Sequence, residues 1–276
     1  MFDLTKTLAI EGCIRVCSDG WHRRWHEGGG GSLTYRMTAA DIILCKPYLH
    51  NMGEWVPMGV RAPGLAGELF ITTGGGKSFR NVEADPPHNL GIVEINDSGD
   101  AWRIVWGLDG GGRPATEFPI HFLCHSARKA ATKGDNRVVY YCRAPHVIAL
   151  TALLPMEDRD FTRALWQSDA ENLAAFPEGI GVCPWTVLGG AEAARELKEK
   201  MRRYRSAVWA RHGLFASGVD LDGAFSLAQS VELSAEICCW GLMAGQGGRQ
   251  VVPDDGLRAI AGSLGVTLNE SFLDGE

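Results

Sequence analysis

Apolar residues recur at a spacing of three or four positions in several parts of the chain, which is the pattern of a helix with one buried face. The first such segment covers 4–27, where Leu8, Cys13 and Cys17 follow this spacing, and the glycine run Gly28–Gly31 ends it. The same pattern predicts helices over 117–132, 145–152, 158–167, 191–204, 221–244 and 254–262.

Shorter segments rich in Val, Ile, Phe and Tyr predict strands. They cover 32–37, 67–73, 137–141, 181–187, 207–210 and 214–216. Residues 90–95 and 102–106 flank a polar turn over 96–100 and predict a hairpin. Strands and helices are mixed along the chain, and no internal repeat, linker or change of composition separates them. The pattern therefore predicts one α/β domain over 1–276.

Charge and composition narrow the class of protein. The 276 residues carry 27 basic and 33 acidic side chains, without the basic excess that is typical of proteins that bind nucleic acids. No apolar segment approaches the roughly 20 residues that span a bilayer, and the first residues lack the basic and apolar regions of a secretory signal. We therefore expect a cytoplasmic protein with no membrane partner and no nucleic-acid partner.

The eight cysteines indicate reduced thiols rather than a disulfide framework. A chain of this length does not need disulfides for stability, and Cys238 and Cys239 lie within a predicted helix. No CxxC pair is present, so a zinc site made of thiolates has no support.

Glycine is the unusual component, at 35 residues where about 7% is ordinary. It forms the runs Gly28–Gly31, Gly74–Gly76 and Gly110–Gly112. The second run continues into Lys77-Ser78 like the end of a P-loop, but Ile71 stands where that motif needs its first glycine. The second run is either a turn after a strand or a turn whose backbone N–H groups bind an anion, and its residues leave both interpretations open.

Glu117, His121 and His125 are spaced by four residues and share one face of the helix predicted over 117–132. Carboxylate and imidazole are zinc ligands. The set spans eight residues, however, or about 12 Å at the helical rise, so packed histidines are the favoured interpretation. His212 ends a strand-like segment and, taken alone, is either a structural residue or a metal ligand.

Short motifs along the whole chain occur in a recognisable order. They are Phe70-Ile71-Thr72-Thr73-Gly74, Lys77, Phe79-Arg80-Asn81-Val82, Asn89-Leu90-Gly91-Ile92-Val93, Trp106-Gly107-Leu108, Glu117 with Pro119, His121-Phe122-Leu123, Ile148-Ala149-Leu150-Thr151, Phe161-Thr162-Arg163, Leu165-Trp166, Phe176-Pro177 and His212-Gly213. In this order they resemble the zinc-dependent class II aldolase family nearly from end to end. The resemblance implies the fuculose-phosphate-aldolase-like α/β fold, with a central mostly antiparallel sheet flanked by helices on both faces. It also implies a C4 homotetramer with active sites at subunit interfaces.

The resemblance further implies a lyase reaction, the reversible cleavage of a ketose 1-phosphate to dihydroxyacetone phosphate and L-lactaldehyde. In this chemistry zinc stabilises the enediolate, a carboxylate moves the proton, and backbone N–H groups hold the phosphate. By position, Glu117 matches the acid/base carboxylate of the metal site and His212 matches one zinc ligand. Glu171 matches a second functional glutamate, which reaches the neighbouring subunit's site.

The two other zinc ligands of the family fall on Tyr141 and Arg143. A tyrosine ligates only as a phenolate, against an ordinary pKa near 10, and an arginine stays protonated. Glu117 and His212 alone are too few for a tight zinc site. We therefore expect Zn²⁺ binding to be weak or absent.

The phosphate loops implied by the resemblance have lost side-chain donors. The matching residues are Gly29, Gly30, Gly31, Ser32, Gly74, Gly75, Gly76 and Thr116. Polar side chains of the family fall on Gly29 and Gly75, whereas Thr116 keeps a hydroxyl. Backbone N–H groups remain available as donors in principle.

Two hypotheses follow. In the first, the protein is a lyase with weak or altered activity, in which His146 or Cys142 supplies another metal ligand. In the second, it is a non-catalytic homologue that keeps the scaffold as a binding or interaction protein, with Arg143 holding an anion in place of zinc.

Overall fold

The computed structural model describes residues 3–51, 53–186, 191–244 and 250–273, which form two compact units. Unit 1 comprises 1–142 and 217–225, and unit 2 comprises 143–216 and 226–276. Each unit has its own strands and helices.

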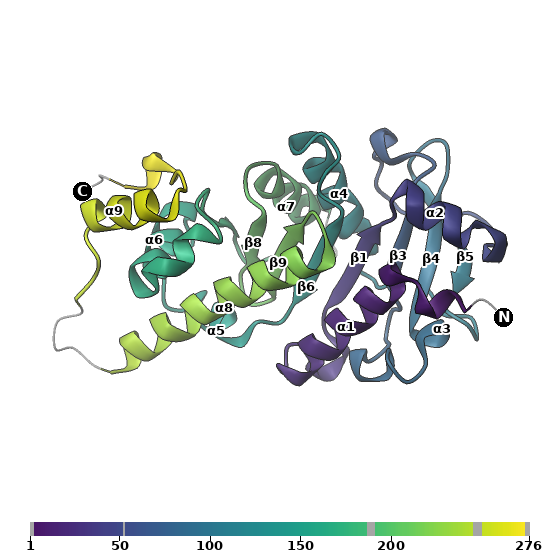
Figure 1. The fold of residues 1–276 in the computed structure, drawn as a ribbon, viewed down its shortest axis with the longest axis horizontal. Helices are drawn as coiled ribbons and strands as arrows, with labels where there is room; N and C mark the ends of the chain where they lie inside the picture. The colour runs from purple at the N-terminus through teal and green to yellow at the C-terminus, as the bar shows by residue number, and fades with distance from the viewer. Residues whose placement is uncertain (1–2, 52, 187–190, 245–249, 274–276) are drawn as a thin grey trace. The chain divides into compact units, whose positions relative to one another are not determined.

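Unit 1 is built on antiparallel strands in the order β2-β5-β4-β3-β1-β6 (Figure 1). These strands are β1 (Ser32–Arg36), β2 (Val56–Pro57), β3 (Leu69–Thr73), β4 (Leu90–Ile95), β5 (Ala101–Gly107) and β6 (Val138–Cys142). Its helices are α1 (Leu8–His22), α2 (Ala39–Cys45), α3 (Pro86–Asn89) and α4 (Phe118–Ala131). The hairpin expected over 90–106 is β4 followed by β5.

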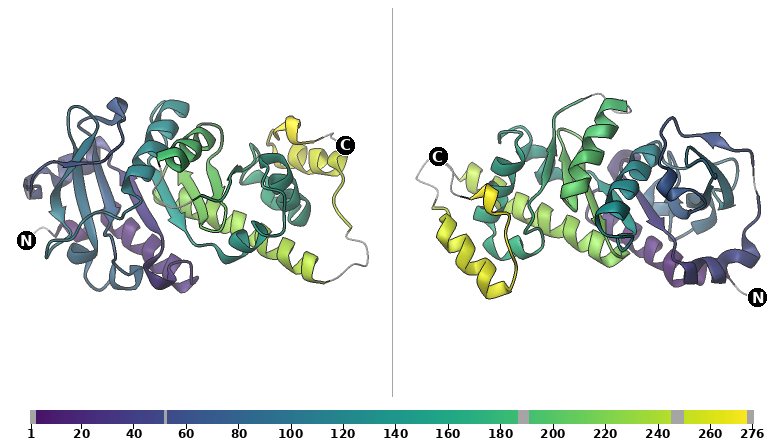
Figure 2. Two further views of the ribbon diagram at one scale, coloured as in Figure 1. Left: turned by 180° about the vertical axis from the view of Figure 1, so that it is seen from behind. Right: turned by 90° about the horizontal axis from the view of Figure 1, so that it is seen from above.

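Side chains of β1 alternate between the two faces of this sheet. Ser32 and Thr34 lie within hydrogen-bond distance of His121 on α4. Tyr35, on the opposite face, donates a hydrogen bond to Asp41 of α2. Helices therefore cover both faces of the sheet in unit 1, which Figure 1 and Figure 2 show from opposite sides.

Aromatic rings form the core between this sheet and α4. Phe70 of β3 meets Phe118 and Phe122 edge to face, with ring centroids 6.2 and 6.1 Å apart. Such pairs contribute about 0.5–1.5 kcal/mol each beyond the burial of their area. Because Phe118 is the first residue of α4, this packing also fixes the position of Glu117.

Unit 2 contains the strand order β9-β8-β7. Strand β8 (Ser206–Trp209) pairs antiparallel with β9 (Gly213–Gly218), which belongs to unit 2 as far as Ala216, and parallel with β7 (Gly181–Cys183). Its helices are α5 (Pro145–Leu150), α6 (Asp158–Ser168), α7 (Ala191–Arg203), α9 (Asp254–Leu264) and α8 (Leu221–Met243), which begins in unit 1. The 3₁₀ helices of both units are η1 (Leu4–Lys6), η2 (Glu27–Gly29), η3 (Lys46–Tyr48), η4 (Pro63–Leu65), η5 (Phe79–Asn81), η6 (Ala170–Ala174) and η7 (Glu270–Phe272).

The helices predicted from residue 117 onwards are all present, within two residues of their expected ends. The single helix expected over 4–27 is wrong, because the extended backbone of Thr7 separates η1 from α1 and α1 ends at His22. The strand expected over 181–187 is shorter in the structure, where β7 ends at Cys183. Residue 187, the last of the expected strand, lies outside the described residues. The assignment of 1–276 to one domain stays a prediction.

None of the described helices combines the length and the apolar character needed to cross a membrane. All eight cysteines are buried free thiols, in agreement with the reduced state expected from the sequence.

Candidate functional site

The first predicted phosphate loop, Gly28–Gly31, connects α1 to β1. Gly29 has a φ of +73° and open space around its Cβ position, so glycine is favoured there by backbone conformation alone. Gly31 has a φ of +96°, and a Cβ there would lie 2.1 Å from Nδ1 of His26 and 2.9 Å from the carbonyl oxygen of Tyr141. The loop therefore packs directly against a buried imidazole and the end of β6.

The hydroxyl of Ser32, the last predicted donor of this loop, is buried beneath α4. Its Oγ lies 2.9 Å from Nε2 of His121, while Oγ1 of Thr34 lies 2.9 Å from Nδ1 of the same ring and 2.8 Å from Nε2 of His125. Burial lowers the pKa of His121 to about 3 and holds the pKa of His125 well below its ordinary value. Both rings are therefore neutral at pH 7. The structure supports the packed interpretation of these histidines, and the Ser32 hydroxyl is already hydrogen bonded.

The second glycine run is joined to the segment before Glu117. Gly74 forms a β-bridge with Pro114, and the N–H of Gly75 donates to the carbonyl of Arg113 at 2.8 Å. The N–H of Gly74 donates to the carbonyl of Asn89, also at 2.8 Å. These two backbone donors of the run are therefore engaged within the fold.

Gly75 and Gly76 differ in what surrounds them. A Cβ at Gly75 would lie 2.9 Å from the carbonyl oxygen of Pro114, so a serine there needs a shift of the neighbouring backbone. Gly76 has a φ of +67° with open space at its Cβ position. In the described part of the chain no backbone hydrogen bond outside helices and strands uses the Gly76 N–H, which makes it the candidate anion donor of this run.

Glu117 lies half-buried at the N-terminus of α4, where its backbone carbonyl accepts from the N–H of His121 at 2.9 Å. Oγ1 of Thr116 donates to Oε2 of Glu117 at 3.1 Å. Because a hydroxyl has a single proton, Thr116 in this orientation supports Glu117 rather than a phosphate group.

Tyr141 and Arg143, the residues expected from the sequence to stand in place of two zinc ligands, differ in their exposure. Tyr141 pairs with Ser32 across β6 and β1, so both side chains lie on the α4 face of the sheet, and the tyrosine is buried. Arg143 follows β6 by one residue and is exposed. The structure thus gives a buried phenol at one position and an exposed cation at the other.

His212 lies in unit 2, in the turn between β8 and β9, and its ring packs edge to face on Trp209 at a centroid distance of 5.0 Å. Nε2 of His212 lies 3.1 Å from the carbonyl oxygen of Thr186. A carbonyl oxygen can only accept, so Nε2 carries the proton in this arrangement and is not a metal ligand. Glu171 is exposed on η6, also in unit 2.

His146, considered as a substitute ligand, is held by a carboxylate of α8. Its Nδ1 and its backbone N lie 2.9 and 3.1 Å from Oε1 of Glu232, and the N–H of Val147 donates to the other carboxylate oxygen at 3.0 Å. Burial raises the pKa of Glu232, and these hydrogen bonds oppose that rise. Glu232 therefore caps the N-terminus of α5. Cys142, the other candidate, is a buried thiol.

The donor set does not fit a tight zinc site. Within neither unit do the described residues bring together three His, Cys, Asp or Glu side chains that could hold a metal ion. Glu117 belongs to unit 1 and His212 to unit 2, and the chemistry of Tyr141 and Arg143 adds no ready ligand. No catalytic step can therefore be derived through a metal.

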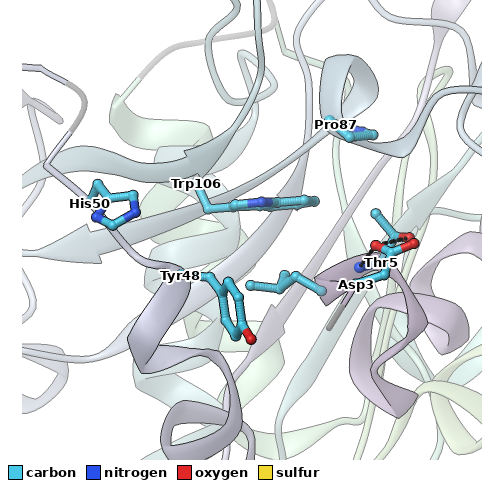
Figure 3. Close-up of a pocket in the computed structure, with 7 residues that line it drawn as sticks. Asp3, Thr5, Tyr48, His50, Pro87 and Trp106 are labelled. Atoms are coloured by element: carbon cyan, nitrogen blue, oxygen red, sulfur yellow. Dashed lines mark hydrogen bonds between the residues drawn. The ribbon is translucent and has the colours of Figure 1, made fainter. Parts of the chain in front are cut away.

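A pocket of about 490 Å³ elsewhere in unit 1 contains none of these residues. Figure 3 shows Trp106 and Tyr48 facing its interior, with His50 at one end. Asp3 and Thr5 lie at the other end, where Thr5 donates to the carboxylate from its hydroxyl and its N–H. The Asp3 carboxylate is thus already hydrogen bonded to Thr5, and none of the site residues expected from the sequence lines this pocket.

Sequence comparison identifies the family. The sequence model described as "Class II Aldolase and Adducin N-terminal domain" matches residues 11–239. The chain belongs to the class II aldolase family. This class II aldolase is 38% identical to the rhamnulose-1-phosphate aldolases of Escherichia coli O157:H7 and of Shigella boydii serotype 4 (strain Sb227), over 273 residues and 99% of each chain. The resemblance inferred from the motifs is confirmed.

Solved structures confirm the class II aldolase fold. A sugar-phosphate aldolase from Thermotoga maritima gives a TM-score of 0.72 at 20% identity, covering 87% of this chain and 97% of that chain. An L-fuculose-1-phosphate aldolase from Thermus thermophilus gives 0.55 at 16% identity, with the same coverage. The predicted α/β class with a central sheet and helices is therefore correct.

Proposed function

We propose that this protein is a lyase of the rhamnulose-1-phosphate aldolase type, acting in rhamnose metabolism with reduced or altered activity. Its substrate is a phosphorylated ketose, cleaved reversibly to dihydroxyacetone phosphate and L-lactaldehyde. The observation that carries the proposal is the 38% identity to rhamnulose-1-phosphate aldolases over 99% of the chain. A cytoplasmic location and a C4 homotetramer with active sites at subunit interfaces are part of the same proposal.

Glu117 is the proposed catalytic acid and base. Thr116 donates to Oε2, so Oε1 is the oxygen that exchanges a proton with the carbon beside the substrate carbonyl. Glu117 directly precedes Phe118, whose packing on Phe70 at the start of α4 positions the carboxylate. Glu171 is proposed to act at the neighbouring subunit's site.

The phosphate group of the substrate is proposed to bind to the backbone of the glycine loops. The N–H groups of Gly31 and Gly76 are the donors that fit this role, because the N–H of Gly29 belongs to the 3₁₀ turn of η2. The N–H of Gly30 donates to the carbonyl of Glu27, and the first two glycines of the second run also donate within the fold. Binding through backbone donors alone predicts weaker phosphate affinity than a loop that adds side-chain hydroxyls and amides.

The alternative is a non-catalytic homologue that binds an anion. It is favoured by Tyr141 and Arg143 at the zinc-ligand positions, and by the hydroxyls of Ser32 and Thr116, which are already hydrogen bonded. In this alternative the exposed guanidinium of Arg143 contacts the anion.

One experiment separates these functions. Cleavage of rhamnulose 1-phosphate is followed through the dihydroxyacetone phosphate released, with and without added zinc, and metal content is measured on the same samples. We expect substoichiometric zinc and slow turnover that Glu117→Gln abolishes. The double variant Tyr141→His with Arg143→His should bind more zinc and turn over faster, because it restores two imidazole ligands.

The matched control is Tyr48→His with Arg61→His, which adds two histidines to exposed positions of unit 1 and should change neither zinc content nor rate. One tightly held zinc per wild-type chain would contradict the degraded metal site. Absence of turnover under both conditions would favour the non-catalytic alternative, whereas zinc-dependent turnover of the wild type would exclude it.

A further inference from the structure

A fully buried imidazole contacts the first glycine loop of unit 1 and the segment that follows the second. Nδ1 of His26 lies 2.9 Å from the carbonyl oxygen of Gly30 in the first loop. The ring stacks on Phe79 with centroids 3.8 Å apart, and Phe79 follows the last glycine of the second loop by three residues. His26 belongs to none of the sequence motifs and connects loops that are about 45 residues apart in the chain.

The hydrogen bonds of His26 fix its tautomer. The Gly30 carbonyl can only accept, so Nδ1 carries the proton, and Nε2 accepts from the hydroxyl of Tyr140 at 2.6 Å. Burial lowers the pKa of His26 to about 4, so the ring is neutral at pH 7. Tyr140 directly precedes Tyr141, so the same ring is bound to the strand that carries one of the altered ligand positions.

Glycines on two sides make room for this ring. A Cβ at Gly20 of α1 would lie 2.6 Å from Nε2 of His26, and a Cβ at Gly31 would lie 2.1 Å from Nδ1. The imidazole thus fits between α1, the first loop, η5 and β6, with no space for rearrangement. A side chain of different shape at this position must move at least one of these elements.

We infer that His26 is a positioning residue of the anion site, fixing the first loop through Gly30 and the second loop through Phe79 so that backbone N–H groups of both loops bind one anion. The inference rests on the proposed function, in which that anion is the phosphate group of the substrate. His26 itself makes no contact with the reacting atoms.

Two substitutions test the two hydrogen bonds of His26 separately, because each keeps only one of them. In His26→Asn the amide nitrogen takes the place of Nδ1 and can still donate to Gly30, whereas in His26→Gln the amide reaches the place of Nε2 and Tyr140. We expect His26→Gln to weaken dihydroxyacetone phosphate binding, measured by calorimetry, at least tenfold, and His26→Asn to weaken it less than threefold. In turnover assays KM should rise by the same factor, while kcat changes less.

The control is Tyr35→Phe, which removes a buried tyrosine hydrogen bond to Asp41 on the same face of the sheet without touching either loop. Its affinity should equal that of the wild type. Equal affinities in His26→Gln, His26→Asn and the wild type would overturn the inference while leaving the proposed function intact.

Hydrogen exchange in the free protein tests the connection between the loops without any ligand. His26→Gln should speed exchange in 28–32 and in 76–79 together, and Tyr35→Phe in neither segment. An increase confined to the first loop would overturn the inference. If the wild type does not bind dihydroxyacetone phosphate, the proposed function fails, and the exchange result alone decides whether His26 couples the loops.

Discussion

Strand β1 buries polar side chains at both of its ends, but with different chemistry. At one end the guanidinium of Arg36 lies 3.1 Å from the carboxylate of Glu68 and 3.1 Å from the carbonyl oxygen of Asn136. At the other end Ser32 is hydrogen bonded to His121, and the first glycine loop to His26, both neutral rings.

The charged Arg36 end serves the stability of the fold, whereas the neutral Ser32 end belongs to the candidate site. A buried charge is stable only while each partner is present, so the Arg36 end tolerates little change. Neutral imidazoles need hydrogen bonds but no countercharge, so residues around the Ser32 end can be exchanged if the shape is kept. Tyr141, which pairs with Ser32 across β6 and β1, and the first glycine loop both lie at the Ser32 end.

The largest expected effect comes from breaking the charged end. Arg36→Met leaves the Glu68 carboxylate with one cation fewer in a partly buried place and should lower the free energy of unfolding by about 3 kcal/mol. Urea unfolding followed by circular dichroism measures this. Arg24→Met, which breaks an exposed pair with Glu27, should lower the free energy of unfolding far less, because water and salt screen exposed ion pairs. If Arg36→Met lowered the free energy of unfolding no more than Arg24→Met does, the buried charge of Arg36 would have no special role in stability, and the contrast between the two ends of β1 would be wrong.

At the Ser32 end the effect should depend on shape. Gly31→Ala adds a methyl group against the His26 ring at a positive φ and should lower the free energy of unfolding by about 2–3 kcal/mol. Gly29→Ala also places an alanine at a positive φ, but with open space around its Cβ, so we expect a loss of about 1 kcal/mol. Parallel urea unfolding of the two variants gives the difference, and equal losses would exclude a role for close packing on His26.

A third prediction distinguishes the neutral rings by the pH dependence of the unfolding free energy. In the folded protein the pKa of His26 is about 4 and that of His121 about 3, whereas the ordinary value in an unfolded chain is near 6.5. Between its folded pKa and pH 6.5, each histidine therefore binds a proton in the unfolded chain but not in the folded one. The contribution of the neutral rings to the free energy of unfolding is complete above pH 6.5. As the pH falls, it decreases by at most about 1.4 kcal/mol per pH unit for each ring. His26→Asn should therefore show a shallower decline of unfolding free energy between pH 6.5 and 4.5. Superimposable pH profiles would contradict a neutral buried His26.

Much of the fold could be predicted from local patterns. The periodic spacing of apolar residues predicted the ends of the long helices α4 and α8 to within one residue, because many turns contribute to the period. Helix α2 and strand β2 are too short to show a period. The break at Thr7 follows from its extended backbone, which the apolar spacing around it does not reveal.

The candidate site could be predicted only in part, because its contacts join distant segments. Motif order located Glu117 and both glycine loops. The bond between His26 and Tyr140 spans 114 positions, and no spacing rule connects such residues. The orientation of Thr116 toward Glu117 likewise depends on the β-bridge that places the loop before α4.

The bridge between Gly74 and Pro114 also limits how the sequence can change next. The Cβ of a serine at Gly75 would lie 2.9 Å from the Pro114 carbonyl oxygen, so a side-chain donor cannot be introduced there without movement of the segment that contains Pro114. Position 29 carries no such restriction, because asparagine tolerates a positive φ and the space there is open. A side-chain donor can therefore be introduced at position 29 by one substitution, whereas at position 75 it requires a coupled change in the segment that contains Pro114.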